Sequence, residues 1–140
     1  MSDTPALLNG IGLAMRHLSE RQRTIAQNIA NSETPGYKAR DVEAPDFGAL
    51  VASQSGSEVH VPRPHVRLSE GMAAMGARAP ENGATMLDQH TSETKPDGNN
   101  VTIEDQLLKM AQVQADFTAL TNLYRKQMSL LKTATGRGGV

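Results

Sequence analysis

Apolar residues recur at alternating spacings of three and four near the start of the chain. They are Leu8, Ile11, Met15, Leu18, Ile25 and Ile29, with Gln22 as one polar break. At about 100° per residue these positions occupy an arc of roughly 100° on a helix, and the charged residues Arg16, Glu20 and Arg23 lie on the other side. The pattern predicts an amphipathic helix with a single seam, which we expect to pack within the chain.

The ends of this first helix follow from its capping and breaking residues. Thr4 followed by Pro5 is typical of a helix start, because Thr caps free backbone N–H groups and Pro lacks a donor that the first turn would not use. Pro35 bars the helix from continuing, so it should end near Asn31. Thr34–Pro35–Gly36–Tyr37 then predicts a type II turn, since Pro and Gly suit its two central positions.

A second long helix is predicted from Thr102 to Gly136, opened by an approximate capping box of Thr102 with Asp105. Its main stripe repeats the alternation of four and three. The stripe consists of Ile103, Leu107, Met110, Gln114, Phe117, Thr121, Tyr124, Met128 and Leu131. We expect Met110, Phe117 and Tyr124 to meet the seam of the first helix, so that the two helices pair as an antiparallel coiled coil.

The second helix also has a second apolar face, on the side opposite Phe117 and Tyr124. Leu108, Leu123 and Leu130 mark this face. Leaving three leucines exposed would forgo roughly 5–9 kcal/mol of burial, at about 1.5–3 kcal/mol each. Either part of the middle segment folds back over this face and the protein is a monomer, or neighbouring subunits cover it. We expect the second arrangement.

Between the helices the apolar period disappears, and Gly, Pro, Ser and Thr dominate. We therefore divide the chain into an N-terminal helix and turn (1–37), a loop-rich insert (38–100) and a C-terminal helix (101–140) that forms one unit with the first part. The insert offers a short β-hairpin between Val59 and Val66 and a helical turn at Met72–Met75. The predicted fold class is mainly all-α.

Composition limits the chain to one small domain. Its 140 residues are 38% hydrophobic but only 3% aromatic, and the formal net charge is −1. Two helices with one seam bury little surface, so we expect a marginal, partly unfolded monomer. The balanced charge argues against nucleic acid as a partner. Neither a secretory signal peptide nor a membrane-spanning run is recognisable.

The sequence offers little material for catalysis or metal binding. It has no cysteine, and no phosphate loop, nucleophile elbow or His-Glu-x-x-His motif occurs. His60 and His65 lie five apart around two prolines without an acidic cluster beside them, so loop histidines are a better interpretation than a metal site. We expect no enzyme activity, no cofactor and no metal.

One long motif resembles a known family. Residues 25–38, Ile-Ala-Gln-Asn-Ile-Ala-Asn-Ser-Glu-Thr-Pro-Gly-Tyr-Lys, are similar to the N-terminal signature of the bacterial flagellar rod and hook family. In that family an Asn-Ile-Ala-Asn stretch closes the first helix and a Thr-Pro-Gly-Tyr turn follows. The matching positions are Asn28, Asn31, Thr34, Pro35, Gly36 and Tyr37.

The C-terminal part carries the resemblance further. Residues 97–101, Glu104, Lys109–Ala111 and Phe117–Leu120 resemble the family's short proximal rod members, which lack a large middle domain. Asn100 and Val101 are the matching positions before the second helix. The resemblance covers roughly residues 5–50 and 95–136.

The resemblance implies a structural subunit of the proximal rod of the flagellar basal body, in the periplasm. Such subunits assemble helically through their terminal helices and transmit torque. The implied partners are other copies, other rod proteins, membrane-ring and rod adaptor proteins, and the flagellar type III export apparatus, which needs no cleavable signal peptide. Phe47 and Val51 match an export signal of that family, although Phe47 could equally anchor the insert. The alternative is a small coiled-coil adaptor that binds one protein partner.

Overall fold

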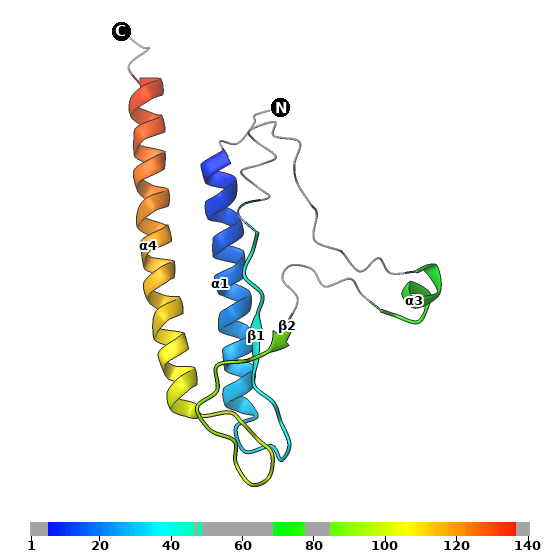
Figure 1. Cartoon of the computed structure of the whole chain (residues 1–140). Helices are drawn as coiled ribbons and strands as arrows, with labels where there is room; N and C mark the ends of the chain where they lie inside the picture. The colour runs from blue at the N-terminus through cyan, green and yellow to red at the C-terminus, as the bar shows by residue number, and fades with distance from the viewer. Residues whose placement is uncertain (1–5, 47, 49–68, 78–84, 137–140) are drawn as a thin grey trace.

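Two long helices lie side by side and run in opposite directions (Figure 1). They are α1 (Ala6–Ala30) and α4 (Ile103–Gly136). This computed structural model describes residues 6–46, 48, 69–77 and 85–136. The mainly helical fold with paired terminal helices, as predicted from the sequence, is confirmed.

The end of α1 follows the predicted capping residues. The helix ends at Ala30, and the Tyr37 backbone N donates to the carbonyl oxygen of Thr34 at 3.2 Å, which closes the predicted turn. Gly36 has a φ of +71°, as the third position of a type II turn requires. The helix end and the turn are therefore confirmed, whereas the predicted start at Thr4 and Pro5 lies outside the described residues.

The core lies between α1 and the first half of α4. Leu18, Ile25 and Val113 form its buried centre, and Ile29, Met110 and Leu120 pack against them. On α1, Ile11 is also buried, while Leu8 and Met15 are partly buried. Every apolar residue of the seam predicted for α1 is thus at least partly buried.

The phase of α4, meaning the set of its residues that face α1, differs from the prediction. Val113 and Gln106 are only 2% and 1% exposed, whereas Phe117 and Tyr124 are 45% and 42% exposed. At about 100° per residue, Gln106 and Val113 lie roughly 60–120° around the helix from Ile103, Leu107 and Gln114 of the predicted stripe. Phe117 and Tyr124 lie on the same side as Gln106 and are nevertheless exposed. The predicted burial of Phe117 and Tyr124 in the seam is therefore wrong for the single chain. The period alone misleads because α4 is apolar on more than one side.

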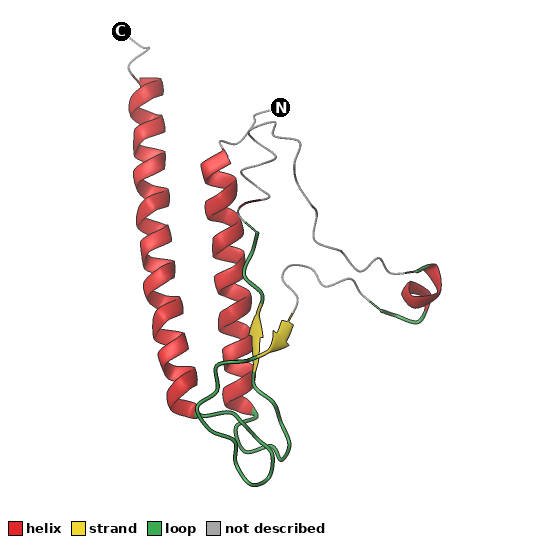
Figure 2. Cartoon of the chain, viewed as in Figure 1, coloured by secondary structure: helices red, strands yellow, loops and turns green. Residues whose placement is uncertain are grey.

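The described part of the insert contains a two-stranded sheet and one short helix (Figure 2). Strand β1 (Arg40–Val42) pairs antiparallel with β2 (Thr85–Leu87), with Asp41 opposite Met86. Helix α3 (Glu70–Ala74) begins where the Ser69 hydroxyl accepts from Met72 N, and it lies away from α1 and α4 (Figure 1).

The predictions for the insert have mixed outcomes. The helical turn expected at Met72–Met75 corresponds to α3 and its cap at Met75. The hairpin expected between Val59 and Val66 lies outside the described residues. The sheet that is present joins strands more than forty positions apart in sequence, which no local pattern indicated.

Among the helices that the structure describes, none is long and apolar enough to cross a membrane.

Candidate assembly site

The buried side-chain amide of Asn28 joins three parts of the chain at the end of the helix pair where α1 ends and α4 begins. We call this end the closed end. Its Nδ2 donates to the Arg40 carbonyl oxygen at 2.7 Å and to Gln106 Oε1 at 2.9 Å. Its Oδ1 accepts from Arg40 N at 3.0 Å and from the Tyr37 hydroxyl at 3.3 Å. The Asn28 amide thus pairs with the backbone N–H and carbonyl groups of Arg40 as a neighbouring strand would. Its hydrogen bond with Gln106 also connects α1 to α4.

A second buried amide, Asn99, closes the same end from the other side. Its Nδ2 donates to the carbonyl oxygens of Asn31 and Thr34, at 2.9 and 2.8 Å. Its Oδ1 accepts from Val101 N at 2.8 Å. Asn99 therefore satisfies carbonyl groups beyond the end of α1 that have no partner within the helix.

The remaining family-motif residues lie in this junction as well. Asn31 Nδ2 caps the Gln27 carbonyl oxygen at 2.8 Å. Asn100 Oδ1 accepts from Ala39 N at 2.6 Å, and Val101 is 1% exposed. Gly36 N donates to the Asp97 carbonyl oxygen at 3.0 Å. The motif residues from both ends of the chain therefore meet in one hydrogen-bonded junction.

Sequence reasoning missed Gln106 as a member of this junction, and it named Asn99 only as part of the family-like segment 97–101. Gln106 was hidden because a single Gln at the start of a helix carries no pattern of its own. A signal was nevertheless present, since Gln106 continues the spacing of Met110 and Val113 towards the helix start. Asp105, expected to close a capping box with Thr102, instead accepts from Ser92 N at 3.1 Å and from the Ser92 hydroxyl at 2.8 Å.

Next to the junction, four charged side chains connect both helices to the sheet. Arg21 Nε donates to Asp41 Oδ1 at 3.0 Å, and Lys109 Nζ lies 3.9 Å from Asp41 Oδ2. Lys109 also pairs with Asp88, whose side chain is 2% exposed. Because α1, β1, the residue after β2 and α4 each contribute one residue, this cluster fixes the sheet against the helix pair.

The electrostatics of Asp41 reflect this arrangement. Burial acts to raise the pKa of its carboxyl group, but hydrogen bonds from Arg21 and Val42 N and the charges of Arg21 and Lys109 outweigh it. The net result is a pKa below the ordinary value. Asp105, at the start of α4, also has a lowered pKa because Ser92 donates hydrogen bonds to its carboxylate.

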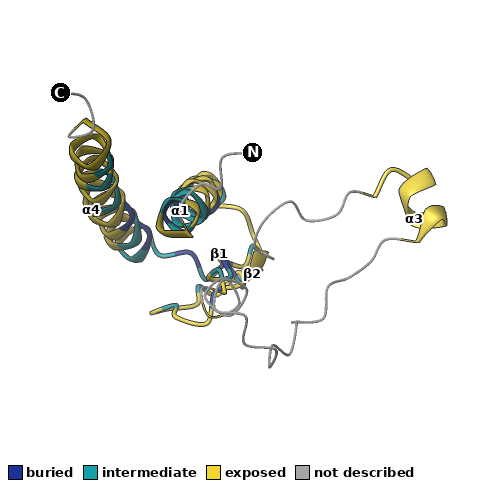
Figure 3. Cartoon of the chain, turned by 90° about the horizontal axis from the view of Figure 1, so that it is seen from above, coloured by how far each residue is buried: buried dark blue, intermediate teal, exposed yellow. Residues whose placement is uncertain are grey.

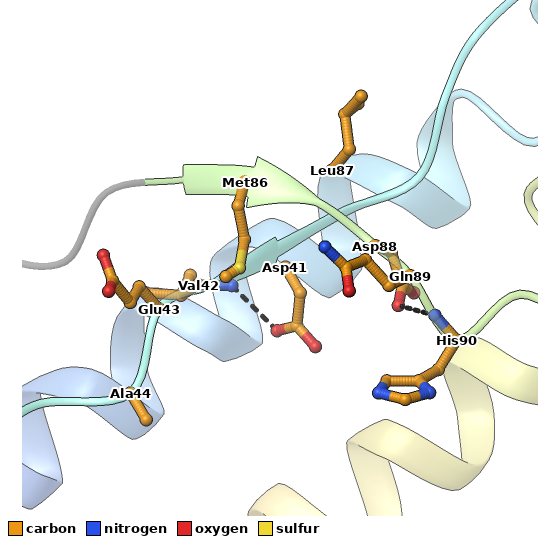
Figure 4. A pocket seen from close by; sticks show the side chains of 9 residues that line it. All are labelled: Asp41, Val42, Glu43, Ala44, Met86, Leu87, Asp88, Gln89 and His90. Atoms are coloured by element: carbon orange, nitrogen blue, oxygen red, sulfur yellow. Dashed lines mark hydrogen bonds between the residues drawn. The ribbon is translucent and has the colours of Figure 1, made fainter.

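A shallow pocket of about 240 Å³ opens beside the sheet, lined by residues of both strands and the positions after them (Figure 4). Its acidic residues include Asp41, which accepts from Val42 N at 2.8 Å, and Asp88, which accepts from His90 N at 3.0 Å. Since both carboxylates are also paired with Arg21 and Lys109, they serve the packing of the sheet.

Most of the exposed large apolar side chains of the described residues belong to α4. The leucines of the predicted second face, Leu108, Leu123 and Leu130, are 71%, 42% and 57% exposed. Five further large apolar side chains of α4 are exposed: Ile103, Leu107, Phe117, Tyr124 and Met128. On α1 only Leu7 belongs to this class. Seen from above, α4 is dark blue and teal towards α1 and yellow elsewhere (Figure 3).

Some predicted residues cannot be placed. Phe47 and Val51, the candidate export signal, and the loop histidines His60 and His65 lie outside the described residues. Within the described ranges, no three His, Cys, Asp or Glu side chains are grouped so that they could hold a metal ion.

Comparisons with known proteins show the family of this chain. Residues 12–38, which include Asn28 and the turn, match the family model of the flagella basal body rod protein. A flagellar basal body rod protein FlgB of Borrelia hermsii is 32% identical over 118 residues, covering 81% of this chain and 85% of the relative. FlgB of Cereibacter sphaeroides is 35% identical over 79% of this chain and 73% of the relative.

A further relative has a lower identity. FlgB of Escherichia coli K12 is 27% identical over 135 residues, covering 86% of this chain and 88% of the relative. The matches thus cover most of the chain and extend well beyond the N-terminal motif alone. The chain belongs to the FlgB family of flagellar basal body rod proteins.

Proposed function

We propose that this protein is a structural subunit of the proximal rod of the bacterial flagellar basal body. Its terminal helices assemble helically with other copies and with other rod proteins, and the finished rod transmits torque. The relatives named above, all flagellar basal body rod proteins, support the rod as the place of action.

One structural observation carries the proposal. Eight large apolar side chains of α4 are exposed in the single chain, against one on α1. A contiguous apolar surface on a soluble helix is typical of a protein interface. Burying Leu108, Leu123 and Leu130 against a neighbour would contribute about 1–2 kcal/mol each, which makes the assembled state the stable one.

The partners and the route follow from the same proposal. The subunit contacts other rod proteins along α4 and adaptor proteins at the membrane ring. It reaches the periplasm through the flagellar type III export apparatus, partly unfolded because the isolated helix pair is marginally stable. The part of Phe47 and Val51 in export stays a prediction.

The test places a charge on the outer face of α4. In the parent bacterium carrying only the variant gene, Leu130→Glu should abolish rod assembly and swimming, because it buries a carboxylate at a subunit contact. Basal bodies are isolated and counted by electron microscopy, and secreted subunit is measured in parallel to show that export continues. Ser129→Glu is the matched control, since Ser129 is exposed and lies about 100° around the helix.

The two outcomes separate the rod from the adaptor. An adaptor that binds a single partner would need only one face of α4. Normal basal bodies in strains with Leu130→Glu and with the corresponding glutamate at Leu123 would contradict assembly through this face.

A further inference from the structure

Gln106 is a buried amide within the contact between α1 and α4. It is 1% exposed, and it lies on the same side of α4 as Met110 and Val113, four and seven positions further on. Its Oε1 accepts from Asn28 Nδ2, a hydrogen bond between residues 78 positions apart. A position of this kind in a helix seam is normally apolar, so the amide calls for an explanation.

The apolar pattern of α4 does not determine which side packs on α1. The stripe that includes Ile103, Leu107 and Met128 has two polar members, Gln114 and Thr121. The side that is used also has two, Gln106 and the half-buried Gln127. Nevertheless Ile103, Leu107 and Met128 are 44%, 56% and 43% exposed. Something other than the apolar period therefore decides the phase of α4.

The Asn28–Gln106 hydrogen bond supplies that decision. If α4 turned by roughly 60° to bury the stripe of Ile103 and Leu107, Gln106 would move away from Asn28. Asn28 could not follow, because Arg40 N and the Arg40 carbonyl oxygen hold its amide at 3.0 and 2.7 Å. One buried N–H group of Asn28 would then lack an acceptor, which is strongly unfavourable in a dry interface.

We propose that Gln106 is the residue that selects the phase of α4, through its hydrogen bond with Asn28. Single buried polar residues fix the alignment of other paired helices in the same way, at some loss of stability. By selecting the phase, Gln106 also determines which apolar residues of α4 remain on the outside. The proposal concerns the single chain and holds whether or not the chain assembles into a rod.

The experiment compares the two phases with single thiols, which is practical because the chain has no cysteine. Val113→Cys reports the observed phase, and Gln114→Cys reports the stripe of Ile103 and Leu107. In the full chain, iodoacetamide should modify the thiol at 113 at least about tenfold more slowly than the thiol at 114, as local opening limits access to a buried group. Adding Gln106→Ala should have opposite effects at the two sites. Modification of the thiol at 113 should become faster, and modification of the thiol at 114 should become slower.

Two further variants distinguish phase selection from simple loosening. Gln106→Glu keeps an oxygen that accepts from Asn28, and it should retain the order of the parent chain. Gln112→Ala removes an exposed amide from the same helix and should change neither rate. The proposal is overturned if the thiol at 114 is not slowed by Gln106→Ala, whether the thiol at 113 stays protected or both react quickly. Equal rates at 113 and 114 in the parent chain would overturn it as well.

Discussion

Asp41 has a carboxylate whose ionised form is stabilised by the fold. Its pKa lies below the ordinary value of 3.8 although burial opposes this. A carboxyl group with a lowered pKa adds stability above the pKa of the unfolded chain, and this contribution is lost as the pH falls through the pKa of the folded state. Stability should therefore begin to decrease near about pH 4, the ordinary pKa of an unfolded Asp, and this contribution is lost as the pH falls through the lower pKa of folded Asp41.

Asp41→Asn should remove this part of the acid sensitivity. At pH 7 the variant should unfold at a lower urea concentration than the parent chain, because Arg21 loses its charged partner. The difference should shrink between pH 4 and pH 2, because the parent loses the same contribution there. Urea titrations followed by the helical circular dichroism signal at several pH values check this, with Glu104→Gln at an exposed site as the control. A difference that stays constant with pH would contradict the assignment.

The residues of the junction were only partly predictable. Asn28, Asn31 and Asn100 stood out because they belong to a recognisable motif, although their partners could not be read from the sequence. Asn28 bonds with Gln106, 78 positions away, and Asn99 bonds with Thr34, 65 positions away. Contacts of this range depend on how the chain returns to α1. No local pattern in the sequence shows where the chain returns to α1.

At the scale of elements, two glycines in similar open surroundings should respond to substitution in opposite directions. A Cβ added at Gly12 or at Gly36 would meet no atom within 4 Å. Gly12 lies inside α1, so Gly12→Ala should stabilise the protein by about 0.5–1 kcal/mol. Gly36 has a φ of +71°, so Gly36→Ala should destabilise it by about 1 kcal/mol.

Thermal melting of both variants by circular dichroism measures this pair, with Gly12→Ala as the control for the effect of an added methyl group. Shifts of the same sign would show that the turn at Thr34–Tyr37 is not held in this conformation in solution.

The elements themselves were largely predictable, because their ends have local causes. Pro35 prevents α1 from continuing. Gly36, with its positive φ, then allows the tight turn that follows. The phase of α4 was not predictable, because Phe117 and Tyr124 continue a regular stripe and yet remain 45% and 42% exposed. The sheet was missed since its three-residue strands are too short to show an alternating pattern.

At the scale of the whole molecule, the two ends of the helix pair differ in character. The closed end is held by amides, ion pairs and the sheet, whereas the buried core does not extend into the last part of α4, where Leu123, Tyr124, Met128 and Leu130 are exposed. This difference fits a subunit whose closed end is held by its own contacts and whose exposed apolar side chains on α4 are covered by neighbouring subunits. The exposure of Leu108, Leu123 and Leu130 was predictable because these leucines lie on the side of α4 opposite Met110, which packs against the core.

The charged cluster connects the helices and the sheet at the closed end. Lys109 is its central cation, because it lies near both Asp41 and Asp88. Lys109→Met would leave the Asp88 carboxylate, with its side chain 2% exposed, without a cation. Leaving a buried charge unpaired costs about 3 kcal/mol, which is comparable with the whole stability expected of such a small unit. The variant should therefore lose most of its helical signal at room temperature. Adding Asp88→Asn should restore part of that signal, because it removes the unpaired charge.

A double-mutant cycle measured by urea titration separates this coupling from the loss of the Lys109 side chain itself. Asp88→Asn alone is the matched control, and it should be milder than Lys109→Met because Lys109 keeps Asp41 as a neighbour 3.9 Å away. If the double variant were as unstable as the sum of the two single variants, the pair would not be coupled. The sheet would then be attached to α4 by packing alone, and the ion pair between Lys109 and Asp88 would not stabilise the closed end.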